Sequence, residues 1–175
     1  MDPIDITPMT EAHWPDVREI YAQGIATRQA TFETEVPSWE EWNGNHLPTC
    51  RLVAKVGDEM VGWAALSAVS RRYVYRGVAE VSVYVAERAR GKGVGSALLA
   101  ALIAESEHNG FWTLQAVIHA QNAISIRTHE KAGFRMVGTR ERIGWLDGRW
   151  LDTVVMERRS KVVGVQTGVA HGTNG

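Results

Sequence analysis

The sequence contains a single cysteine, Cys50, among its 175 residues. No disulfide can therefore form within the chain, and we expect a reducing, cytoplasmic environment. Long apolar segments are also missing, since the longest uninterrupted run covers the eight residues 97–104, whereas a helix needs ~20 residues to cross a bilayer. Residues 1–5 are acidic and lack the basic and apolar parts of a signal peptide. We therefore expect neither a membrane partner nor a signal peptide.

An excess of charge of one sign is missing as well. The 19 lysines and arginines nearly balance the 20 aspartates and glutamates, which gives a net charge of −1. Because nucleic-acid binding depends on clustered positive charge, we expect no nucleic-acid partner. The six histidines include no pair spaced four residues apart, and Cys50 is the only thiol. The sequence therefore also predicts no metal site.

The length and composition are typical of one globular domain. Hydrophobic residues make up 45% of the chain and charged residues 22%, and a chain of this size buries about 70% of the surface that it exposes when unfolded. We predict a single domain over residues 1–160. Residues 161–175 contain four glycines and neither an aromatic nor an acidic residue. We therefore expect them to form a flexible tail outside the core and the active site.

The hydrophobic pattern predicts four helices and seven strands. The helices are expected over 11–22, 38–44, 93–109 and 122–132, and the strands over 4–7, 51–56, 59–69, 80–85, 113–118, 134–143 and 149–158. Gly24 is expected to end the first helix. The order β-α-α-β-β-β-α-β-α-β-β favours an α/β fold with a mixed, mainly antiparallel seven-stranded sheet flanked by four helices.

A glycine-rich turn joins the strand at 80–85 to the helix at 93–109. Gly91, Gly93 and Gly95 leave the backbone unscreened, so that successive N–H groups can converge on one anion. The helix N-terminus adds roughly half a positive charge, and Arg90 and Lys92 add full charges. The turn therefore predicts a phosphate or pyrophosphate site.

Two better-known phosphate motifs do not fit this turn. A Walker loop needs serine or threonine after Gly91-Lys92, where this chain has Gly93. A dinucleotide fingerprint needs a further glycine three residues after the second one, where this chain has Ser96 or Leu98.

The segment Arg90-Gly91-Lys92-Gly93-Val94-Gly95 resembles the pyrophosphate signature of the GNAT superfamily of acetyl-CoA-dependent N-acetyltransferases, Arg/Gln-x-x-Gly-x-Gly/Ala. Residues 122–125 and 129–134 resemble the second half of the same cofactor site. The resemblance narrows to the phosphinothricin/methionine sulfoximine acetyltransferase branch through the segments 20–21, 31–35, 72–75, 80–85 and 148–152. It covers about residues 4–158 and implies the GNAT acyl-CoA N-acyltransferase fold, with acetyl-CoA as co-substrate and no metal.

The resemblance also implies which residues bind acetyl-CoA: Val83, Tyr84, Val85, Arg90, Gly91, Lys92, Gly93, Val94, Gly95, Ser96, Asn122 and Ser125. Backbone N–H groups around Tyr84 and Val85 are candidates to polarise the thioester carbonyl. In this family the strand that carries them parts from the next strand, and the pantetheine arm lies in the gap. For Asn122 and Ser125, capping of the following helix is an equally good interpretation.

Glu80 is the candidate general base. It is an acid inside a β-rich run, where a charge is disfavoured unless the position faces a cleft. The alternation of the strand places Glu80, Ser82 and Tyr84 on its more polar face. A carboxylate there can take a proton from an ammonium group, directly or through water. The alternative is a solvated carboxylate or an ion pair with Arg72 or Arg76.

The resemblance places His129 where this family carries the proton donor to the CoA thiolate. Such a thiol has a pKa of roughly 8.5, so an imidazolium is a competent acid near pH 7. The alternative is a histidine on a helix surface beside Glu130.

The candidate substrate contacts are Phe32, in the loop between the first two helices, and Arg72 and Tyr75, in the loop before Glu80. The guanidinium of Arg72 matches a carboxylate, phosphinate or sulfone oxygen. A solvated loop is the alternative for Arg72. Trp145 and Trp150 flank a hairpin turn and are expected to line a subunit interface or the mouth of the site. We expect a homodimer.

The function that the resemblance implies is acetylation of the α-amino group of a small amino acid or analogue, such as phosphinothricin or methionine sulfoximine or sulfone. The resemblance implies direct attack in a ternary complex. Acetylation of a protein N-terminus or of a polyamine is an alternative, and a polyamine site would require an acidic cleft. A non-catalytic acyl-CoA-sensing module is another, but it would need neither Glu80 nor His129.

Overall fold

The computed structural model describes residues 2–166, so the part of the predicted tail at 167–175 lies outside the described residues. The described chain contains every predicted helix and strand, in the predicted order. The strands are β1 (Ile4–Pro8), β2 (Leu52–Val56), β3 (Glu59–Ala68), β4 (Val78–Val85), β5 (Thr113–His119), β6 (Arg135–Leu146) and β7 (Arg149–Arg159), and the helices are α1 (Trp14–Ala26), α2 (Trp39–Asn45), α3 (Val94–His108) and α4 (Ala123–Lys131).

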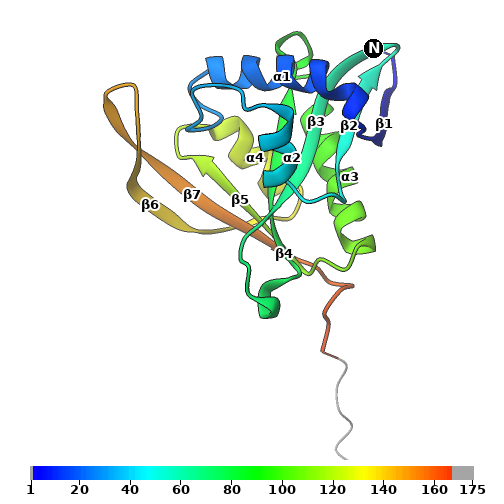
Figure 1. Ribbon diagram of the computed structural model, residues 1–175. Helices are drawn as coiled ribbons and strands as arrows, with labels where there is room; N and C mark the ends of the chain where they lie inside the picture. The colour runs from blue at the N-terminus through cyan, green and yellow to red at the C-terminus, as the bar shows by residue number, and fades with distance from the viewer. Residues whose placement is uncertain (1, 167–175) are drawn as a thin grey trace, which may run out of the picture.

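The strands form one sheet in the order β1-β2-β3-β4-β5-β7-β6 (Figure 1). Five of the six neighbouring pairs are antiparallel, and only β4 and β5 run parallel. The parallel pair follows from the chain path, because α3 carries the chain back across the sheet between these two strands. The predicted mixed, mainly antiparallel α/β fold is confirmed.

The β4–β5 pair is short. Its register includes only three residue pairs, of which Glu80↔Gln115 is the last. Beyond that pair β4 continues to Val85 and β5 to His119, so the two strands diverge. Backbone groups of β4 and β5 that face the resulting gap have no strand partner across it. The expected parting of these two strands is therefore confirmed.

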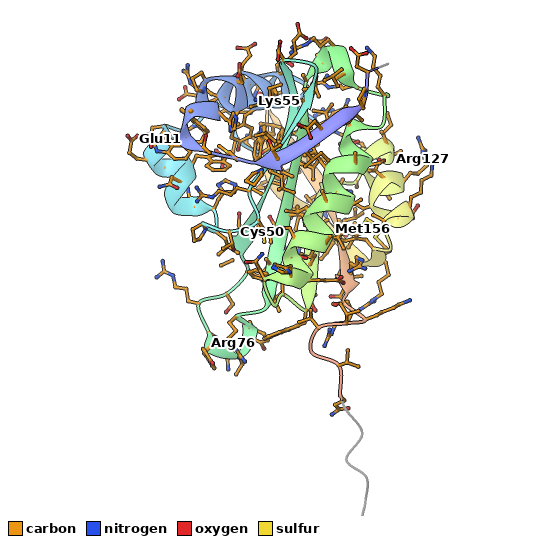
Figure 2. The ribbon with its side chains drawn as sticks, turned by 90° about the vertical axis from the view of Figure 1, so that its right-hand side faces the viewer. Glu11, Cys50, Lys55, Arg76, Arg127 and Met156 are labelled. Atoms are coloured by element: carbon orange, nitrogen blue, oxygen red, sulfur yellow. The ribbon has the colours of Figure 1, made fainter. Side chains whose placement is uncertain are left out.

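Helices cover both faces of the sheet. In Figure 2, α1 and α2 lie on one side of the sheet, and α3 and α4 on the other. On the first side Tyr21 of α1 packs edge-on against Trp63 of β3, with ring centroids 5.6 Å apart. On the second side α3 approaches β3 closely, because a Cβ atom on Gly62 would lie 2.8 Å from Leu98. The core is thus built from both faces of β3 and β4, next to the gap.

The prediction that Gly24 ends the first helix is wrong. Residues 11–13 form a 3₁₀ turn, and α1 runs from Trp14 through Gly24 to Ala26. Gly24 is needed for packing instead of termination, since a Cβ atom there would lie 2.6 Å from the Tyr84 ring. The glycine lets α1 lie directly on the tyrosine of β4.

The hairpin of β6 and β7 is longer than predicted and extends away from the rest of the domain (Figure 1). Its first strand reaches Leu146, where the sequence pattern predicted an end at residue 143. Trp145 and Trp150 face each other near its tip and are 57% and 56% exposed. Gly144 lies under the Phe32 ring, which a Cβ atom would meet at 2.2 Å. The hairpin thus holds Phe32 in place.

Candidate active site

The glycine-rich turn forms an open helix N-terminus. Gly91 and Gly93 have φ angles of +72° and +83°, which side-chain-bearing residues rarely adopt. Gly93 directly precedes the first residue of α3. The first N–H groups of α3 have no acceptor within the helix and lie at the positive end of its dipole. The turn is therefore suited to hold a phosphate or pyrophosphate.

A cavity of about 600 Å³ lies beside this turn. Eleven of the twelve predicted cofactor-binding residues line it: Val83, Tyr84, Val85, Arg90, Gly91, Gly93, Val94, Gly95, Ser96, Asn122 and Ser125. Lys92 is the exception, and its Nζ donates a hydrogen bond to the Arg88 carbonyl at 2.8 Å. Asn122 also caps α4, because its Oδ1 accepts from the Ser125 N–H. The two interpretations of Asn122 are thus compatible.

A second cavity of about 440 Å³ adjoins the first. Both are lined by Gln29, Ala30, Val83, Tyr84, Asn122 and Ser125, so they meet where β4 and β5 have diverged. The second cavity is also lined by Glu80, His129 and Phe32. An elongated molecule in the first cavity and a small one in the second would therefore touch at this junction.

Glu80 lies at the point where β4 and β5 separate. Its Oε1 accepts a hydrogen bond of 2.9 Å from Nε2 of Gln115, its partner on β5. Among the described residues Glu80 has no ion pair with Arg72 or Arg76. Gln115 thus orients the carboxylate toward the second cavity.

The role of Gln115 is not evident from the sequence. The only signal was a polar residue inside the otherwise apolar run of β5, and its pairing with Glu80 depends on a parallel register that local patterns do not encode.

His129 is buried, with 7% of its surface exposed, which excludes the surface alternative. Its Nδ1 lies 2.7 Å from the Ser125 carbonyl, and because a carbonyl only accepts, Nδ1 carries the proton. Nε2 of the neutral ring therefore has a free lone pair. Burial lowers the pKa of His129 below its usual 6.5. The ring is therefore mostly neutral at pH 7, and Nε2 must take up a proton before it can donate one.

The predicted substrate contacts are not all brought together. The Phe32 ring lines the second cavity and lies 4.6 Å from the His119 ring. Arg72 and Tyr75 lie on the exposed loop between β3 and β4, where the guanidinium stacks over the tyrosine ring at 5.4 Å. Neither residue lines the two cavities described above. Arg76 in the same loop lies at the far end of the molecule from α1 (Figure 2).

Stability is expected to fall as the pH drops below 6.5. Burial lowers the pKa values of His119 and His129, so the unfolded chain takes up protons that the folded protein resists. Each such histidine can remove up to about 1.4 kcal/mol per pH unit between 6.5 and its folded pKa, which lowers Tm by roughly 3–6 °C per pH unit. Calorimetry from pH 7.5 to 5.5 measures this slope. His119→Gln and His129→Gln should each flatten it, and an unchanged slope in both variants would contradict the assignment.

Within residues 2–166, no group of three or more His, Cys, Asp or Glu side chains is arranged to hold a metal ion. No helix in that part of the chain is long and apolar enough to span a membrane.

Comparison with known proteins agrees with this geometry. The profile of the Acetyltransferase (GNAT) family matches residues 9–134. Phosphinothricin N-acetyltransferase of Alcaligenes faecalis is 35% identical over 152 residues, which cover 82% of this chain and 76% of that protein. L-methionine sulfoximine/L-methionine sulfone acetyltransferase of Pseudomonas aeruginosa is 31% identical, with 83% of this chain and 88% of that protein covered.

A solved structure that contains acetyl-CoA shares the fold of this chain. The GNAT superfamily phosphinothricin acetyltransferase from Sinorhizobium meliloti, solved in complex with acetyl-CoA, superposes with a TM-score of 0.85. It is 31% identical, and the match covers 96% of this chain and 94% of that one. The open helix N-terminus and the cavity beside it fit the same ligand. The chain therefore belongs to the GNAT acetyltransferase family and is an acyltransferase with acetyl-CoA as its co-substrate.

Proposed function

We propose that the protein acetylates the α-amino group of a small amino acid or amino-acid analogue of the phosphinothricin or methionine sulfone type. The observation that carries this proposal is the pair of joined cavities, with the Glu80 carboxylate lining the smaller one. A volume of about 440 Å³ suits a small acceptor. The names of the two curated relatives support the same class of acceptor.

Direct transfer from acetyl-CoA to the amine fits the chemistry of the site. Cys50 is buried, and burial raises the pKa of its thiol to about 11, so it is a poor nucleophile. It also lines a separate cavity next to β1 and α3. A ternary complex without an acyl-enzyme is therefore the simplest route. Backbone N–H groups of β4 around Tyr84 and Val85 are the proposed donors to the developing oxyanion.

Proton transfer is divided between two side chains in this proposal. Glu80 takes one proton from the substrate ammonium, so that the neutral amine can attack the thioester carbon. The attacking nitrogen then carries an excess proton, and Nε2 of neutral His129 accepts it. The same proton passes from His129 to the sulfur as the carbon–sulfur bond breaks. The products are the amide, the free thiol and one proton released by Glu80 to solvent.

The test is an assay of thiol release from acetyl-CoA, with the acetylated product identified by mass spectrometry. The acceptors are phosphinothricin, methionine sulfoximine, methionine sulfone, the natural amino acids, spermidine and a short peptide with a free N-terminus. We expect turnover with one or more of the amino acids or analogues and little with the other two. Turnover restricted to spermidine or the peptide would replace the proposal by the corresponding alternative. Binding of acetyl-CoA without turnover would favour a sensing module.

We also propose that the protein is a cytoplasmic homodimer. The lone buried thiol supports a reducing compartment. Ile143 and Trp145 on the outermost strand β6, together with Trp150 on β7, are each more than half exposed and support an interface on the long hairpin.

We further propose that Arg72 and Tyr75 contact the substrate. The family resemblance alone supports this proposal.

A further inference from the structure

Two buried polar side chains in the second cavity are not used by the proposed reaction. His119 at the end of β5 is 4% exposed, and Thr153 of β7 is 1% exposed. Both line the second cavity. Within the described part of the chain, neither nitrogen of the His119 ring nor the Thr153 hydroxyl has a hydrogen-bond partner. The second cavity thus contains three buried polar atoms that lack a hydrogen-bond partner, the two ring nitrogens of His119 and the hydroxyl oxygen of Thr153.

The register of the sheet places the His119 and Thr153 side chains next to each other. His119 and Thr153 are directly opposite each other on the antiparallel strands β5 and β7, where facing Cβ atoms are about 5 Å apart. The Phe32 ring packs against the imidazole, with ring centroids 4.6 Å apart, and limits its movement. A buried polar group without a partner is strongly unfavourable. An apolar residue would serve packing at either position better, so packing alone does not account for this pair.

The chemistry of the pair selects the kind of group that it can bind. Burial lowers the pKa of His119, so near pH 7 its neutral ring offers one N–H donor and one acceptor. The threonine hydroxyl can also donate. The charged residues that line the second cavity are the carboxylates Glu33 and Glu80, with no lysine or arginine among the lining residues. Two neutral donors side by side match an oxygen that accepts two hydrogen bonds.

We propose that His119 and Thr153 determine acceptor specificity by donating hydrogen bonds to one oxygen of the acceptor, while its amino group is directed toward Glu80. This inference rests on the proposed function, since it concerns the same cavity. The oxygen belongs either to the α-carboxylate or to a phosphinate, sulfoximine or sulfone group of the side chain. Both sources share the same hydrogen-bonding chemistry, and the acceptors used in the test distinguish them.

The test compares His119→Leu and Thr153→Val with the wild type. Steady-state kinetics are measured with methionine sulfone, with methionine, which lacks the sulfone oxygens, and with 3-(methylsulfonyl)propylamine, the decarboxylated analogue, which lacks both carboxylate oxygens. The loss of one hydrogen bond should raise KM for methionine sulfone about tenfold in each variant, with KM for acetyl-CoA unchanged. The penalty should vanish for whichever analogue lacks the bound oxygen. Thr153→Ser and His119→Gln, which keep a donor, should recover part of the affinity.

Ser106→Ala is the matched control, because Ser106 is equally buried but its hydroxyl bonds the Ile103 carbonyl inside α3. It should leave every KM unchanged. If His119→Leu and Thr153→Val lower kcat equally for all acceptors, or leave the ratios between acceptors unchanged, the pair is structural and the inference is overturned.

A binding measurement separates this inference from the proposed function. Methionine sulfone is titrated into the wild type and both variants by calorimetry in the presence of CoA. Binding that depends on His119 and Thr153, but without acetylation of any amino acid, would support the pair and overturn the proposed function. Acetylation by the wild type with equal binding in all three proteins would overturn only the pair. No binding to the wild type would overturn the pair as a site for this class of acceptor.

Discussion

Replacing Glu80 by glutamine is expected to lower kcat about 100-fold, as is typical for the loss of a general base. The substitution keeps the shape of the side chain, and the amide oxygen can still accept the hydrogen bond that Gln115 donates in the native protein. The experiment therefore removes the charge and the basicity without removing the contact that orients the side chain. Acetyl-CoA affinity should not change, because Glu80 lines only the second cavity.

The measurements are kcat across pH 5.5–9 and the Kd for acetyl-CoA by calorimetry. The limb of the pH profile in which activity rises with pH should be altered in Glu80→Gln, since that limb reports deprotonation of the base. Glu59→Gln is the control, because Glu59 starts β3, outside both cavities, and pairs with Arg88. Turnover at the wild-type level in Glu80→Gln would assign deprotonation of the amine to another group or to bulk water.

Gly93→Val is expected to weaken acetyl-CoA binding by roughly 100-fold, equivalent to about 2.7 kcal/mol. The backbone at Gly93 has a φ of +83°, and a Cβ atom added there would have no neighbouring atom within 4 Å at the N-terminus of α3. Gly93 lines the first cavity, so a valine side chain there would occupy the space of the pyrophosphate. It would also strain the turn whose N–H groups bind that anion.

Gly57→Val separates the two effects. Gly57 lies in the turn between β2 and β3, has a φ of +59° and is also open around its missing Cβ, but it lines neither cavity. Both variants should lose similar stability in thermal melts, while only Gly93→Val should lose affinity for acetyl-CoA. Equal acetyl-CoA affinities in the two folded variants would contradict the assignment of the pyrophosphate site.

The fold could be predicted where a local pattern carries the information. The alternation in β4, the apolar stripe of α3 and the helix start at Asn122 each depend on residues close in sequence, and all three lie where the patterns indicate. Gly24 was misjudged because its role depends on Tyr84, which is 60 residues away. A glycine that ends a helix and a glycine that allows close packing have the same local signature.

The candidate site was predictable to the extent that one motif or a resemblance covers it. The turn at Arg90–Gly95 and the segment from Asn122 to His129 were identified from short motifs and meet at one cavity. Gln115, His119 and Thr153 were not identified, because their roles come from strand register between distant segments. The lowering of the His129 pKa could not be predicted from local patterns either, because it depends on burial.

The divergence of β4 and β5 gives the domain two strand edges that face each other in its interior. Exposed edges are normally a hazard, because their unpaired N–H and C=O groups accept a further strand from any chain that fits. Here both edges belong to inner strands of the sheet and line the two joined cavities. A thin molecule with amide groups along its length can pair with such edges as a peptide strand does, whereas a compact molecule can meet only one of them. The backbone of the sheet thus filters donors by their shape, before any side chain contributes to recognition.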